Sequence, residues 1–262
     1  MHTFVVMRTY LKLGFLNMLQ YRANFFFEVL GVTTHLITAF LGLAIVFNQT
    51  NSLNGWSSTE IVILVGIQTM IGGLLGTVIE PSFQQFMEHV RQGTLDFTLT
   101  KPADAQTMVS LQRINGGAIA GIIAGMVTLT YGVTKRAESV GVSEAVLFLL
   151  TLTAGVVIVY CFLLILTTFA FWFVKLDNIL VIFGTSFGTA GSWPITIYPG
   201  WLKASLTFVI PVAFAVTIPA QSLTGRLDTS WVFGTFAAAI AFIIVSRLFW
   251  RFGLKHYTGA SA

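Results

Sequence analysis

Long apolar stretches alternate with short polar segments along most of this chain. Five stretches have roughly the 20 residues that a helix needs to cross a hydrocarbon core of about 30 Å. They are predicted to span the membrane over residues 24–47, 61–79, 109–133, 145–174 and 229–250. A further stretch, residues 179–193, is glycine-rich and short for a full crossing. We expect these six segments to form an all-α integral membrane protein with a single domain over residues 1–262.

Small residues recur one helical turn apart in two of these spans. Gly72 and Gly76 lie in the second span, and Gly117, Gly121 and Gly125 lie in the third. Such spacing is typical of helix faces whose backbones approach each other closely in a membrane. The glycines of both spans therefore predict close contacts with a neighbouring helix.

Residues 1–23 precede the first span and mix apolar with basic side chains. Phe4, Met7, Leu11, Phe15 and Met18 recur at helical spacing, and two cations four residues apart lie on another face. This pattern is typical of an amphipathic helix in the headgroup plane. A plain helical lead-in to the first span is the alternative.

Four of the six prolines lie between residues 192 and 224, just before the last span: Pro194, Pro199, Pro211 and Pro219. The region is apolar enough for the membrane, yet proline interrupts a continuous helix. Irregular backbone at membrane depth is tolerated only against protein or a water-lined cavity. We therefore expect one or two re-entrant helices that enter from the outer side.

One polar segment stands out, between the second and third spans, from Glu80 to Arg113. It carries seven of the chain's 24 charged side chains. Spacing of i, i+3, i+4 and i+7 predicts a short helix with one apolar face, made by Phe83, Phe86, Met87 and Val90. Gly93 is placed to end that helix.

The rest of the polar segment is predicted to turn back towards the membrane. Apolar and polar residues alternate over 95–100, which predicts an extended or tightly turned piece. Pro102 suits the start of another helix with Asp104 in its first turn. Residues 80–108 would then form a compact elbow, with an ordinary membrane-surface loop as the alternative.

Composition agrees with a membrane protein. Only 9% of the 262 residues are charged, against about 25% in soluble proteins, and the mean hydropathy is +0.84. The net charge of +4 comes from basic residues that are spread along the loops, which argues against a nucleic-acid partner. The lone cysteine, Cys161, excludes an intramolecular disulfide and is expected to be a buried free thiol.

Lysine and arginine are divided unevenly between the two sides that the spans define. Ten fall on the side of the termini and the polar segment: Arg8, Lys12, Arg22, Arg91, Lys101, Arg113, Lys175, Arg247, Arg251 and Lys255. Four fall on the other side: Lys135, Arg136, Lys203 and Arg226. Because basic loops stay in the cytoplasm, both termini and the polar segment are predicted to be cytoplasmic.

Candidate catalytic chemistry is sparse. The four histidines lack the spacing of a metal site, and no lysine is followed by Ser or Thr, so the nucleotide-binding pattern GxxxxGK[ST] is absent. His35 lies deep in a span, and we expect a neutral ring bonded to a neighbouring helix, with a functional role as the alternative. An enzyme and an ion-coupled pump are disfavoured. Energy for uphill transport would come from a soluble ATPase docked on the polar segment.

Several segments in order resemble one family. The polar segment reads FMEHVRQ followed by GTLDFTLTKPAD, the region before the last span contains PITIYPGWL and IPVAF, and the chain ends in RLFWRFGLKHYTGASA. Together they resemble the signatures of ABC transporter permeases of the type-2 exporter class, in a bacterial branch whose members are alike over their whole length. One departure from the family pattern is Ala213, which intervenes before Phe214.

The resemblance implies a permease subunit in the bacterial cytoplasmic (inner) membrane. ATP and Mg²⁺ would be held by a separate ATP-binding subunit, and this chain would hold no cofactor or metal. Two copies of that subunit and a second permease, identical or homologous, are the expected partners. The ATPase-coupling surface would map to Phe83, Phe86, Met87, Glu88, Arg91, Gly93, Leu95, Asp96, Lys101 and Pro102.

The same resemblance places a translocation path and an outer gate. The path would be lined by Gln68, Thr69, Ser186 and Thr189, and the gate by Trp193, Pro194, Tyr198, Pro199, Trp201 and Pro211. Because the spans carry few charges, an amphiphilic or lipid-like cargo is predicted, exported by alternating access. An ATP-independent channel or secondary transporter, and a membrane scaffold without transport activity, are the alternatives.

Overall fold

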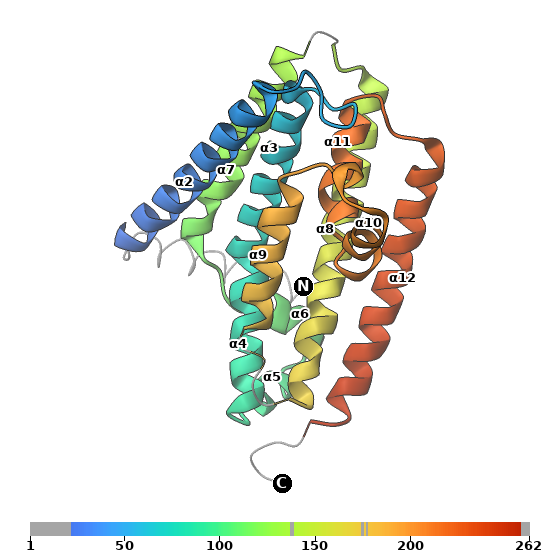
Figure 1. The fold of residues 1–262 in the computed structure, drawn as a ribbon. Helices are drawn as coiled ribbons and strands as arrows, with labels where there is room; N and C mark the ends of the chain where they lie inside the picture. Colours follow the sequence, from blue (N-terminus) through green and yellow to red (C-terminus); the bar gives the residue numbers. More distant parts are fainter. Residues whose placement is uncertain (1–21, 137–138, 174–175, 177, 258–262) are drawn as a thin grey trace.

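The computed structural model describes residues 22–136, 139–173, 176 and 178–257, so residues 1–21 of the predicted N-terminal amphipathic helix lie outside it. Within these ranges the chain is helical and forms no strand beyond an isolated bridge between Leu53 and Trp56. The long helices lie side by side in one bundle (Figure 1). They are α2 (Arg22–Phe47), α3 (Ser58–Leu74), α7 (Ile119–Lys135), α8 (Val142–Thr168) and α12 (Thr229–Leu254).

Five helices of the described chain are long and apolar enough to cross a membrane, and a bent helix pair makes a sixth candidate. The predicted all-helical membrane fold is thereby confirmed. The predicted segment at 179–193 forms α9 (Ile179–Gly191), whose 13 residues fall short of the roughly 20 that a crossing needs. The sixth candidate is therefore the bent pair rather than α9.

The second span and the start of the polar segment form one helix of 34 residues, Ser58–Arg91. A capping box begins it, in which Ser57 Oγ accepts from the Glu60 N–H and Glu60 Oε2 accepts from the Ser57 N–H at 2.8 Å. A π-helical stretch, η1 (Leu75–Ile79), then connects α3 to α4 (Glu80–Arg91). Gly93 follows the end of α4 with a φ of +68°, a backbone conformation that glycine adopts without strain.

The remainder of the polar segment is helical in short pieces. Residues 95–100 are tightly turned rather than extended, because α5 (Asp96–Leu99) is a single turn. Asp104 precedes α6 (Ala105–Ser110) as its N-cap, accepting from the Thr107 N–H at 3.0 Å. The third span begins later than the predicted residue 109. Asn115 caps a new start, accepting from the Gly117 N–H, and η2 (Gly116–Ala118) leads into α7.

The closest helix contact in the bundle joins α3 to α7 through glycines. A Cβ added at Gly125 would lie 2.3 Å from the Met70 backbone nitrogen, and one at Gly73 would lie 2.4 Å from that of Ile122. The predicted close contact of the third span is therefore confirmed. The prediction for Gly72 was wrong: a Cβ there would meet only Gln68 Nε2, at 3.9 Å. Gly72 points away from α7, because adjacent helical residues are rotated by about 100°.

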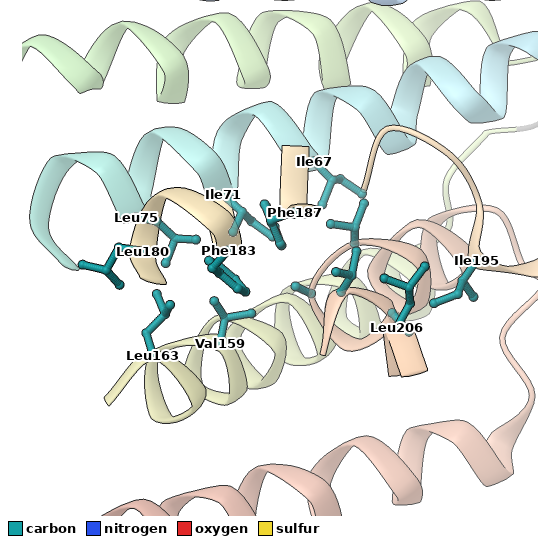
Figure 2. Packing of buried hydrophobic residues seen from close by; sticks show 14 of the residues in the cluster. Ile67, Ile71, Leu75, Val159, Leu163, Leu180, Phe183, Phe187, Ile195 and Leu206 are labelled. Atoms are coloured by element: carbon teal, nitrogen blue, oxygen red, sulfur yellow. The ribbon is translucent and has the colours of Figure 1, made fainter. Parts of the chain in front are cut away.

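Helix α9 packs between α3 and α8. Figure 2 shows Phe183 and Phe187 of α9 lying between Ile71 of α3 and Val159 of α8. All four side chains are buried, and they belong to one continuous apolar core. This contact fixes α9 as one wall of the space beside α3.

The region before the last span is broken, as predicted. A short turn, η4 (Ile195–Ile197), precedes a first arm of α10 (Gly200–Ala204) with η5 (Ser205–Val209), and the second arm is η6 (Ala213–Thr217) with α11 (Ile218–Leu223). The two arms meet at 83°, the geometry of a broken span or a re-entrant loop. The first arm is largely exposed. The second is buried against α8, where a Cβ added at Gly155 would lie 2.4 Å from the Phe214 carbonyl oxygen.

Contacts between loops distinguish the two ends of the bundle. At one end the guanidinium of Arg226, before α12, donates to Glu60 at the start of α3, and Arg136 donates to the Leu223 carbonyl. At the opposite end Arg247 of α12 pairs with Asp104 of the polar segment, and α4, α5 and α6 gather there (Figure 1). The polar segment and the broken region therefore occupy opposite halves of the fold.

Candidate functional site

A cavity of about 420 Å³ opens beside the long helix α3–α4. That helix lines the wall with five residues spaced four apart, Gln68, Gly72, Gly76, Glu80 and Gln84, and with Thr69, Gly73 and Pro81 beside them. Residues four apart lie on one face of a helix, so the cavity follows a single stripe from mid-span to the polar segment. Helix α2 forms the facing wall, and Gly188 of α9 and Asn115, Ala118 and Gly121 beside α7 complete it.

The deep end of the cavity holds a hydrogen-bonded pair. His35 Nε2 of α2 lies 3.1 Å from Gln68 Oε1 of α3, as expected for a ring bonded to a neighbouring helix. Thr69 lies beside this pair, and its hydroxyl donates to the Val65 carbonyl within its own helix. Gln68 is only 5% exposed. Its amide nitrogen has no acceptor within the described chain.

The other end of the cavity, next to the polar segment, carries two carboxylates. Asn115 Nδ2 donates to Glu28 Oε1 at 3.0 Å, which ties the start of α2 to the start of α7. The Asn115 N–H also donates to the Thr77 carbonyl in the π-helical stretch, at 2.8 Å. Glu80 has no hydrogen-bond donor or cation partner among the residues that the structure describes, and it lies close enough to Glu28 for the two charges to repel.

Two of the four predicted path residues line this cavity. Gln68 and Thr69 do so, whereas Ser186 and Thr189 belong to α9 outside the lining, where only Gly188 takes part. The sequence reasoning missed Glu28, Glu80 and Asn115. The four-residue repeat from Gln68 to Gln84 was a usable signal for one wall, but no pattern in the sequence joins residue 28 to residue 80.

The apolar face of α4 packs inside the chain. Phe83 and Phe86 are fully buried, and the Phe86 ring lies 5.5 Å from that of Phe171 and 5.2 Å from that of Trp250. Met87 and Leu95, also predicted for the coupling surface, are buried as well. These side chains fix the polar segment to the ends of α8 and α12.

The outward face of the polar segment presents the remaining predicted residues. Arg91 and Glu88 form an ion pair on α4, with Arg91 Nε 2.9 Å from Glu88 Oε2. Lys101 and Pro102 are exposed, Asp96 and Gly93 are half-buried, and Phe97 of α5 is 75% exposed. A large exposed aromatic side chain among charges is typical of a protein-contact surface.

An ion pair joins this segment to the last helix. Arg247 Nη2 lies 2.5 Å from Asp104 Oδ2, and Arg247 Nη1 donates to Gln106 Oε1 at 2.7 Å. The hydrogen bond from Arg247 is the main cause that lowers the pKa of the Asp104 carboxyl from its ordinary value, against an opposing effect of burial. Asp104 thus remains ionised at neutral pH.

The predicted gate residues lie in and before the broken region. Pro194 and Pro199 hold extended backbone at the starts of η4 and α10, and Pro211 lies at the bend. Trp193 and Tyr198 are half-buried, and the Tyr198 hydroxyl lies 3.4 Å from the Ala190 carbonyl. Trp201 is exposed on the first arm.

No cluster of three or more potential metal ligands occurs within the described ranges. A search of curated proteins and a search of solved structures found no significant match. The family model described as "ABC-2 family transporter protein" matches residues 33–261, most of the chain. Its match covers the cavity-lining α3, the polar segment and the broken region. The chain therefore belongs to the ABC-2 family of transporters, as a multi-pass transmembrane permease.

Proposed function

We propose that this permease exports an amphiphilic cargo across the bacterial cytoplasmic membrane by alternating access, driven by a separate ATP-binding subunit. Membership of the family implies an ATP-binding partner. In the proposed complex two such subunits hold ATP and Mg²⁺ and do the hydrolysis, and two permeases, identical or homologous, enclose the path. Both termini and the polar segment face the cytoplasm.

The observation that carries this proposal is that the polar segment has one face packed inside the chain and another face exposed. Its inner face is locked to α8 and α12 through Phe86, and its outer face presents Phe97 between the Glu88–Arg91 pair and Lys101. A partner that pushes on the outer face would move the whole segment as one body. Because α4 continues into α3, that motion would reach the cavity wall directly.

The opposite end supplies the elements of an outer gate. The two arms of the broken region meet there, and Trp193, Pro194, Tyr198, Pro199, Trp201 and Pro211 would form the gate. Arg226 is bidentate to Glu60 at 2.8 and 2.9 Å. Arg136 and Arg226 are both engaged in contacts within the chain, which accounts for basic residues on the side proposed to be outer.

The test is the ATPase activity of the permease purified with its ATP-binding subunit in lipid nanodiscs. Phe97→Ala should weaken subunit association and lower vanadate-sensitive ATPase activity by about tenfold, the effect of removing a buried aromatic from an interface centre. Charge reversal at both Glu88 and Arg91 should act in the same direction. Phe233→Ala is the matched control, because Phe233 is 71% exposed on α12, far from the polar segment in sequence.

Two outcomes would contradict the proposal. Normal ATPase coupling in the Phe97→Ala protein would show that the partner docks elsewhere. Transport by this chain alone in liposomes, without any ATP-binding subunit, would support an ATP-independent channel or secondary transporter instead.

A further inference from the structure

The cavity beside α3 carries two carboxylates that no cation among its described lining residues balances. Glu28 and Glu80 both line it, and none of the lining residues that the structure describes is lysine or arginine. Asn115 gives Glu28 one neutral donor, and Glu80 has no donor at all within the described ranges. Carboxylates removed from bulk water are costly unless a cation or donors compensate them. The cavity therefore favours a positively charged occupant.

The middle of the cavity wall, here called the glycine slot, carries few side-chain atoms. Between the two polar ends of the cavity the lining consists largely of glycines with Val32 and Ala118. A Cβ added at Gly31 or Gly188 would meet nothing within 4 Å. These two glycines therefore border open space and not a closely packed helix. A volume of about 420 Å³ lies within the range of small-molecule sites. A hydrocarbon body fits such walls.

An independent feature marks the deep end as a binding point. Gln68 is 95% buried, its amide oxygen is taken by His35, and its amide nitrogen faces the cavity without an acceptor. His35 lies seven residues beyond Glu28 on α2, roughly 10 Å at 1.5 Å per residue. An occupant would meet carboxylates at one level and an unused hydrogen-bond donor about two turns deeper.

We propose that this cavity binds a cationic amphiphile, with an amine or quaternary ammonium head between Glu28 and Glu80 and its body along the glycine slot towards Gln68. The inference rests on the proposed function in one respect, because it names the charge class of the cargo. An anionic lipid is disfavoured by the two carboxylates. A divalent cation is disfavoured by too few ligands, since Ca²⁺ takes about six to eight oxygens.

The test is direct binding to the full chain in nanodiscs, without an ATP-binding subunit. Equilibrium dialysis of radiolabelled dodecyltrimethylammonium, corrected with empty nanodiscs, should show saturable binding, and dodecyl sulfate should show none. Glu28→Gln together with Glu80→Gln should weaken binding of the cation by at least about tenfold, the size of a hydrogen bond to a charged group. Asp228→Asn is the control, because it removes one exposed carboxylate while preserving the N-cap of α12.

Two further variants keep the test decisive if the double substitution impairs folding. Glu80→Lys should abolish binding of the cation, because the introduced ammonium would pair with Glu28 and leave no unbalanced negative charge in the cavity. Gly72→Leu should abolish cation binding by filling the slot while both carboxylates remain. Unchanged binding of the cation in the double Gln protein, or equal binding of dodecyl sulfate to the unmodified chain, would overturn the proposal.

The outcomes separate this inference from the proposed function. If the chain binds the cation through Glu28 and Glu80 but never couples to an ATPase, the inference about the cavity holds and the proposed exporter function is wrong. Normal ATPase coupling with no charge preference in the cavity would do the reverse.

Discussion

The long helix α3–α4 has faces that pack against other helices and an open face that borders the cavity, and glycine occurs on both. Gly66 and Gly73 lie against the backbone of α7, and further along Phe83 and Phe86 are buried against α8 and α12. Gly72, Glu80 and Gln84 line the cavity, which Gly73 also borders. A glycine in this helix therefore indicates either close packing or a passage.

The difference shows what each face contributes. Backbone contact in a membrane is stabilised by van der Waals packing that a larger residue would prevent, so the packed face determines stability. The open face makes few internal contacts and is free to bind. Four substitutions test this division, two at packed positions of α3–α4 and its partner helix α7 and two at the open face.

The largest effect is expected from Phe86→Ala on the packed face. Loss of a buried phenylalanine leaves a cavity and should lower the free energy of unfolding by about 3–5 kcal/mol. Gln84→Ala, two residues away on the open face, should change it by less than about 0.5 kcal/mol. Thermal unfolding in detergent micelles measures both, and equal losses in the two proteins would remove the distinction between the faces.

Gly125→Ala should give the next largest loss. Its Cβ would lie 2.3 Å from the Met70 nitrogen and 2.7 Å from the Gly66 carbonyl oxygen, so the two helices must move apart. Overpacking of this kind costs about 1–3 kcal/mol. Unfolding by sodium dodecyl sulfate titration is the measurement, and a stability equal to that of the unmodified protein would show that the α3–α7 contact is not tight.

Gly72→Ala is the same substitution on the open face and should have the opposite sign. No packing is lost there, and alanine is favoured over glycine in a helix interior by about 0.5–1 kcal/mol. The same titration should show an unchanged or slightly raised midpoint. A destabilisation as large as that of Gly125→Ala would mean that the cavity wall is packed.

Asp104→Asn should have a small, pH-dependent effect on the free energy of unfolding, because it removes the ion pair that joins the polar segment to α12. Hydrogen bonding to Arg247 lowers the pKa of Asp104, so the ion pair contributes stability above the ordinary pKa of aspartate. That contribution is lost as the pH falls through the lowered value. At neutral pH the variant should lose less than about 1 kcal/mol, as expected for a partly exposed pair, and the loss should vanish in acid.

A second N-cap serves as the comparison for this variant. Asp228 caps α12 as Asp104 caps α6, yet it forms no ion pair within the described chain. Asp228→Asn should therefore lack the loss that removal of the Arg247 ion pair causes at neutral pH. A matching pH profile in the two proteins would attribute the effect to capping instead of Arg247.

Much of the fold could be predicted from the sequence, because the length and hydropathy of each membrane span are local properties of the chain. The apolar stretches predicted which parts of the chain form the long helices, Gly93 marked the end of α4, and the prolines marked the broken region. Boundaries failed where local capping decided them. Asn115 starts α7 later than hydropathy indicates, since an apolar run does not show which residue caps a helix.

The sequence alone determined that this is a multi-pass helical membrane protein with one large polar segment and a family signature, because the bilayer imposes length and hydropathy on each span independently. Only the tertiary structure decided which face of each span is packed. It turned Phe83 and Phe86 inward, directed Gly72 to a cavity, and brought Glu28 beside Glu80. In lipid the inner and outer faces of a helix are equally apolar, so the pattern of one span does not reveal its neighbours.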